Sequence, residues 1–150
     1  MSEGINQEIY LLEHNDLCMM DTMQDETISE FKELYLKTAN EYLTILGQNL
    51  RELEKNNSEE LFQRLFMASH SLKSQSLAMN YIQIGRIART LEILFQLRTN
   101  PTKSISPDNI SSIQSLLEFI KISLVSIEKT GEEKSLSENE YTNLAKIQKG

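Results

Sequence analysis

His70 and Lys73 are the residues in this sequence whose types and spacing could do chemistry. They lie in a strongly helical stretch, residues 66–79, and residues three apart on a helix are neighbours. A histidine ring nitrogen can act as a nucleophile and carry a phosphoryl group, and the Lys73 ammonium would lie beside any charge built on the His70 ring. We therefore treat this pair as the candidate active element.

The predicted helix places the His70 ring at a boundary between core and solvent. At about 100° per residue, the apolar residues fill an arc about half the circumference wide, with His70 at its edge. The arc comprises Leu61, Phe62, Leu65, Phe66, Ala68, Leu72 and Leu77. Gln63, Ser71 and Ser74 lie beyond His70, so one flank of the ring can face water. The alternative is a partly buried histidine satisfied by ordinary hydrogen bonds.

The sequence as a whole predicts an all-α fold. Glycine and proline are scarce, at 5 and 2 residues, and apolar residues recur three and four positions apart. Helix start and stop signals divide the chain into a flexible or loosely packed N-terminal tail, residues 1–24, and a helical domain, residues 25–150. Capping residues predict helix starts at Thr27, Ser58, Ser106 and Ser137, and breaks are predicted at Asn56-Asn57, Asn80 and Gly131. The first helix should therefore end at about Lys55, and the third should run from about Tyr81 to Arg98.

Short connections between long helices favour antiparallel neighbours, so the four long helices should form an antiparallel up-down bundle with a short fifth C-terminal helix. On the third helix, Tyr81, Gly85, Ala88, Glu92 and Phe95 form one row, and its small residues permit close approach of a facing helix. The Glu92 carboxylate in that row needs a partner. The alternative to a partner across the helix pair is a solvated ion pair with Arg89, three residues earlier.

Composition excludes several other classes of protein. The net charge of −7 argues against nucleic-acid binding, and the single cysteine, Cys18, forbids an internal disulfide. With no signal peptide or uninterrupted membrane-length apolar run, we expect a cytoplasmic protein with no membrane partner. The soft donors of the tail could bind copper, but their spacing matches no defined site and packing explains the methionines equally well. They are His14, Cys18, Met19, Met20 and Met23.

Residues 68–74, Ala-Ser-His-Ser-Leu-Lys-Ser, followed by Ala-Met-Asn-Tyr at 78–81, resemble the histidine phosphotransfer (HPt) domain. The pattern of that family is roughly A-H-x-L-K-G-x-x-x-x-[MF]-G-[FY], and the register needs no gaps. Residues 34–43 and 89–92 further resemble the N-terminal phosphotransfer domain of CheA-type chemotaxis histidine kinases, which also has a fifth helix. The resemblance covers about residues 27–148.

The resemblance implies a role for each candidate residue. His70 would be the phosphoacceptor, and Lys73 would stabilise the phosphoryl group. Glu92 would orient and tune His70 by accepting the Nδ1 proton, which leaves Nε2 as the nucleophile. The secondary candidates are Arg89, which could help to hold phosphate, and Gln63 and Ser74. Ser74 stands where the family has a glycine that eases the approach of a partner.

The implied mechanism divides the work between proteins. A histidine kinase catalytic domain would phosphorylate His70, and a response-regulator receiver domain would take the group onto an aspartate. ATP and Mg²⁺ would belong to those partners, and this chain, without a phosphate-cradling glycine loop, would need no cofactor or metal of its own. The isolated domain should be a monomer. A non-phosphorylated HPt-like adaptor is the alternative, motivated by Ser74; an unrelated enzymatic bundle lacks a further catalytic group.

Overall fold

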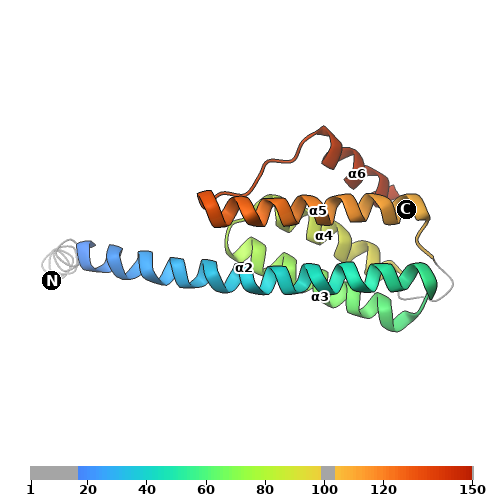
Figure 1. Ribbon diagram of the computed structural model, residues 1–150, viewed down its shortest axis with the longest axis horizontal. Coiled ribbons are helices and arrows are strands. Elements are labelled where there is room, and N and C mark those ends of the chain that lie inside the picture. Colours follow the sequence, from blue (N-terminus) through green and yellow to red (C-terminus); the bar gives the residue numbers. More distant parts are fainter. Residues whose placement is uncertain (1–16, 99–103, 150) are drawn as a thin grey trace, which may run out of the picture. The chain divides into compact units, whose positions relative to one another are not determined.

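The computed structural model describes residues 17–98 and 104–149, with side chains from residue 26 onward. Its elements are the helices α2 (Leu17–Lys55), α3 (Glu59–Ala78), α4 (Ile82–Leu97), α5 (Pro107–Thr130) and α6 (Glu138–Lys149) (Figure 1). The described residues contain no strand, which confirms the prediction of an all-α fold. The chain divides into two units, one up to Leu34 and one from Tyr35 onward, and the second contains the core and the candidate site.

The first helix begins earlier than predicted. It starts at Leu17, whereas the capping signal at Thr27 predicted a start ten residues later, so that prediction was wrong. No glycine or proline interrupts residues 17–27, and methionine, glutamine and glutamate there are good helix formers. The soft donors proposed for copper lie outside the described part of the chain, because His14 precedes it and no side chain is described before residue 26.

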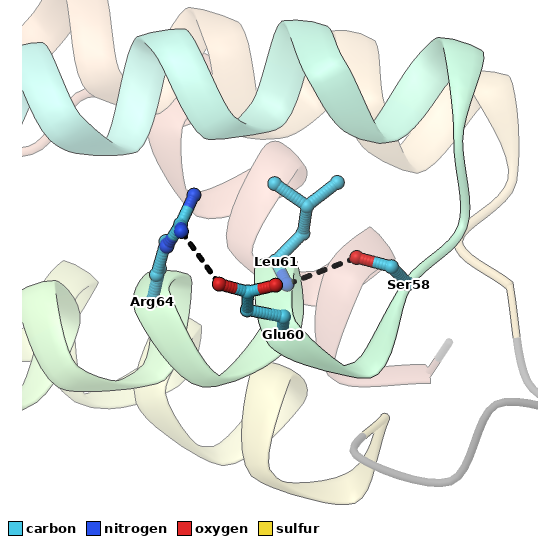
Figure 2. Close-up of polar contacts among 4 residues, drawn as sticks. All are labelled: Ser58, Glu60, Leu61 and Arg64. Carbon is cyan, nitrogen blue, oxygen red and sulfur yellow. Dashed lines mark hydrogen bonds and ion pairs between the residues drawn. The ribbon is translucent and has the colours of Figure 1, made fainter.

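The start of α3 is fixed by its own side chains, as Figure 2 shows. The Ser58 hydroxyl accepts a hydrogen bond from the Leu61 amide at 3.2 Å, so it satisfies one of the unpaired donors of the first turn. Glu60 forms an ion pair with Arg64, one turn later, at 2.6 Å. Both residues of that pair are exposed, so the pair adds little stability. The predicted start at Ser58 is confirmed.

The other predicted helix ends are also confirmed. Asn80 has a φ of 65° and ends the turn after α3, in the left-handed region that asparagine tolerates. Ser106 caps α5, and Gly131, with a φ of 82°, ends it. Before α6, the Glu140 carboxylate accepts hydrogen bonds from both the amide and the hydroxyl of Ser137. The Ser137 hydroxyl lowers the pKa of the Glu140 carboxyl because it hydrogen-bonds the charged form.

Buried apolar side chains from all five helices form one core in the unit that begins at Tyr35. The largest fully buried side chains are Phe62, Phe95, Leu46, Leu50, Leu65, Leu72, Ile84, Ile87, Leu91, Ile113, Leu116 and Ile120. Helix α3 packs along α4, and α6 packs on α5 and α4 (Figure 1). Among the described helices, only α5 is long and apolar enough to cross a membrane, but more than half of its apolar window is buried, as in a core helix.

Polar contacts join α2 to α3 next to this core. The Tyr35 and Ser76 hydroxyls share a hydrogen bond of 2.8 Å, and the Thr38 hydroxyl donates to Gln75 at 2.7 Å. Burial raises the pKa of Tyr35, so its phenol stays protonated and can take part in this bond. The Tyr35 ring also lies against that of Tyr81, with ring centroids 5.0 Å apart. These contacts tie α3 and the residue before α4 to α2.

Helix α4 begins with a cap that comes from far along the chain. Its N-cap residue, Tyr81, offers no side-chain hydrogen bond. Instead, the Glu133 carboxylate, in the connection between α5 and α6, accepts from the amides of Gln83 at 2.9 Å and Ile84 at 3.0 Å. A carboxylate at a helix N-terminus satisfies unpaired donors and complements the positive end of the helix dipole. The start of α4 therefore depends on Glu133.

We expect Glu133→Ala to lower the free energy of unfolding by about 1–2 kcal/mol, because two amides of the first turn lose their acceptor. Urea denaturation followed by far-UV circular dichroism measures this change. Glu132→Ala is the matched control, since the exposed Glu132 takes part in hydrogen bonds through its backbone only. Equal losses in the two variants would contradict a capping role for Glu133.

Candidate functional site

The candidate site lies across the antiparallel pair of helices α3 and α4. The two helices approach closely where Leu77 lies over Gly85: a Cβ built on Gly85 would be 2.6 Å from Leu77 Cδ2. This confirms that the row of small residues on α4 permits close packing. Leu77, which the helical projection placed on the apolar arc, is nevertheless 47% exposed, so this end of the arc does not face the core. Leu77 covers the Gly85 backbone at the edge of the helix pair.

Glu92 of α4 brings the two predicted residues of α3 together. Its Oε2 lies 2.8 Å from Lys73 Nζ and 3.3 Å from His70 Nδ1. Neither contact has the angles of a hydrogen bond, so we treat both as close electrostatic contacts. The side chain of Glu92 is 14% exposed and that of His70 is 49% exposed. The carboxylate therefore holds the inner edge of a ring whose other edge reaches water.

Phe66 covers part of the His70 ring. The two rings are stacked, with centroids 6.1 Å apart and an angle of 23° between their planes. Phe66 is itself half-buried against the core, so it supports the ring from the protein side. Phe66 was predicted only as a member of the apolar arc, although its spacing of four residues from His70 was a usable signal for a place at the site. The predicted position of His70 at the edge of the apolar arc is confirmed.

The alternative partner for Glu92 was Arg89. In the described part of the chain, both ion pairs of Glu92 go to α3, and the Arg89 side chain is exposed. The contacts of Leu77 with Gly85 and of His70 with Glu92 define one antiparallel register, in which Arg89 lies level with Lys73. Arg89 is therefore a second positive charge near the site but is separate from its carboxylate.

The remaining candidates, Ser74 and Gln63, both lie on the exposed surface of α3. Ser74 is one turn after His70 on the same face. Gln63 is two turns before it and lines a groove of about 630 Å³ between α2 and α3. This groove is mostly apolar, and its other lining residues are Tyr42, Ile45, Asn49, Glu60, Arg64, Met67, Ala68 and Ser71. Met67 and Ser71 are helical neighbours of His70, which does not itself line the groove.

The fold and the site together define a class of protein: a domain that is helical over its described residues and presents a half-exposed histidine beside a lysine and a mostly buried carboxylate on the next helix. The model of the Hpt domain family matches residues 30–121. The chain belongs to this family. Hpt domains are histidine phosphotransfer modules of two-component signalling, whose general partners are histidine kinases and response regulators.

Two curated relatives carry the name chemotaxis protein CheA. They come from Listeria monocytogenes serovar 1/2a and Listeria innocua serovar 6a, and each is 30% identical to this chain over 70 residues. The aligned segment covers 45% of this chain but only 11% of each relative. The chain therefore resembles one domain of a much longer protein. No solved structure matches it at a significant level.

Proposed function

We propose that this chain is a phosphocarrier in which His70 accepts a phosphoryl group from an ATP-dependent histidine kinase and passes it to an aspartate of a response-regulator receiver. The observation that carries the proposal is the contact between His70 Nδ1 and Glu92, in a member of the Hpt family. We also propose that the four long helices form the antiparallel up-down bundle that this role requires.

The contact with Glu92 selects the nucleophilic atom of the ring. A carboxylate facing Nδ1 favours the tautomer that carries its proton on Nδ1, so the lone pair of Nε2 faces solvent. Nε2 then attacks the γ-phosphorus of ATP held by the kinase; the Nε2–P bond forms, the P–O bond to the leaving group breaks, and ADP departs. In the second step a receiver carboxylate oxygen attacks phosphorus, and the Nε2–P bond breaks.

Lys73 supplies positive charge to this chemistry. With neutral His70, the Lys73 ammonium and the Glu92 carboxylate cancel, whereas a phosphoryl group adds a charge of about −1.5 to −2. The phosphoryl oxygens would therefore compete with Glu92 for the ammonium, which lies 2.8 Å from the carboxylate before phosphorylation. Arg89, level with Lys73 and exposed, adds a further positive charge on the α4 side.

The surface around His70 fits transient docking of a protein partner. Met67 and Leu77 lie on either side of His70 along α3 and are about half exposed, and the apolar groove opens beside Met67. Exposed apolar groups beside a reactive side chain are typical of interaction sites. We propose that kinase and receiver dock here in turn, in the cytoplasm, that ATP and Mg²⁺ stay with those partners, and that the isolated domain is a monomer.

One assay tests the proposed function. The full chain is incubated with labelled ATP and a chemotaxis-type histidine kinase from which its own phosphotransfer domain has been removed, and a receiver domain with Mg²⁺ is then added. We expect acid-labile, base-stable label on the chain, followed by its transfer to the receiver. A chain that binds either partner but takes no label would instead support the adaptor alternative.

We expect Glu92→Ala to slow phosphorylation of His70 about tenfold while the fold stays intact, because the ring loses the group that orients it. The initial rate of labelling by the kinase measures this effect, and far-UV circular dichroism checks the fold. Glu118→Ala, an exposed glutamate on α5, is the matched control. An unchanged rate in Glu92→Ala would remove its proposed role.

A further inference from the structure

Ser74 is an exposed residue of α3, one turn after His70. At about 100° per residue, Ser74 is rotated about 40° from His70 in one direction and Lys73 about 60° in the other. Residues four apart on a helix have Cβ atoms about 5–6 Å apart, and helical side chains lean toward the N-terminus. The Ser74 side chain therefore leans over the turn that carries His70, on the side away from Lys73.

The Ser74 hydroxyl is also free to take a new partner. Within the described residues it makes no hydrogen bond, unlike the hydroxyls of Thr44 and Thr90, which donate to the carbonyl four residues earlier. Lys73 is already engaged by Glu92 at 2.8 Å. A phosphoryl group on Nε2 would therefore meet the Ser74 hydroxyl on the side opposite Lys73. This hydroxyl can donate to the group without first breaking another contact.

We propose that the Ser74 hydroxyl donates a hydrogen bond to a phosphoryl oxygen on Nε2 of His70, and that this bond lengthens the lifetime of the phosphohistidine. The inference rests on the proposed function, because it requires a phosphoryl group on His70. Ser74 would then stabilise the phosphoryl group at a position where the sequence pattern of the family has glycine, which has no side chain. Lys73 and Ser74 would then hold the group from opposite sides.

The expected effect follows from how phosphohistidine is lost in water. A water oxygen bonds to phosphorus, the Nε2–P bond breaks, a proton from the water passes to Nε2, and inorganic phosphate leaves. In a loose, metaphosphate-like transition state the phosphoryl oxygens carry less negative charge than in the bound group. A donor to those oxygens therefore stabilises phosphohistidine more than the transition state, so hydrolysis becomes slower.

The test uses the full chain and needs no kinase. Wild type, Ser74→Ala and Ser74→Thr are phosphorylated with phosphoramidate, the reagent is removed, and the phosphohistidine signal is followed by ³¹P NMR. We expect Ser74→Ala to lose the signal about three to ten times faster than wild type, because one hydrogen bond to a charged group is lost. Ser74→Thr keeps the hydroxyl and should decay at nearly the wild-type rate.

Ser71→Ala is the matched control, since Ser71 lies next to His70 but is rotated about 100° around the helix. It should decay like wild type. Equal lifetimes in wild type and Ser74→Ala, or a Ser74→Thr variant as labile as Ser74→Ala, would overturn the inference while leaving the phosphocarrier function standing. Absence of phosphohistidine at residue 70 in wild type would overturn both. Alanine is the best helix former, so Ser74→Ala should fold normally.

Discussion

His70→Gln abolishes acid-labile phosphate on the chain: we expect no label after incubation with kinase and ATP, against clear labelling of wild type. Glutamine keeps a polar side chain of similar reach but has no ring nitrogen that can be phosphorylated. The His70 side chain is half exposed, so its replacement should change the free energy of unfolding by less than about 0.5 kcal/mol. The survival of the label at acid and at alkaline pH identifies phosphohistidine, and thermal unfolding checks that the variant is folded. Together they separate loss of the phosphoacceptor from loss of the fold.

His14→Gln is the control for this experiment, because His14 is the other histidine of the chain. It should take label at the wild-type rate. Label that survives His70→Gln but disappears in His14→Gln would move the phosphoacceptor to His14 and refute the site proposed around Glu92. A wild-type chain that binds its partners without any label would refute phosphotransfer itself.

We expect Leu72→Ala to have the largest effect on stability, a loss of about 3 kcal/mol. Leu72 lies between His70 and Lys73 in sequence but points into the core, where it is fully buried. The truncation leaves a cavity beneath the turn that presents both polar residues. Urea denaturation monitored by circular dichroism gives the free energy of unfolding. The comparison holds when the slope of this free energy against urea concentration is the same in both variants.

Leu77→Ala supplies the matched comparison on the same helix. Leu77 is nearly half exposed and lies over Gly85, so its truncation should cost about 1 kcal/mol, well below the loss in Leu72→Ala. If the two variants lost equal stability, the assignment of Leu72 to the core and Leu77 to the edge would be wrong.

The features that the sequence predicted well are those controlled by nearby residues. Capping at Ser58 and Ser106 and the left-handed ends at Asn80 and Gly131 depend on one or two turns of chain, and all four are confirmed. The row that contains Gly85 and Glu92 also follows from helical spacing alone. The start of α2 is the exception, because a capping sequence marks a helix end only where the preceding residues stop being helical.

Features that depend on contacts between residues far apart in the chain could not be predicted from the sequence. The cap that Glu133 provides joins residues 49 and 50 positions apart, and no local pattern indicates it. The exposure of Leu77 depends on how closely α4 approaches α3, which helical spacing does not give. The contact of Glu92 with Lys73 also required the register of the helix pair; spacing showed only that Glu92 needed a partner.

The Glu133 cap affects the stability of any shortened form of this protein. The family match ends at residue 121, inside α5, so a fragment cut there would keep His70, Lys73 and Glu92. It would nevertheless lose the carboxylate that closes the first turn of α4, the helix that carries Glu92. We therefore expect a fragment that ends at residue 121 to be less stable than the full chain, because the helix that carries Glu92 would have lost its cap.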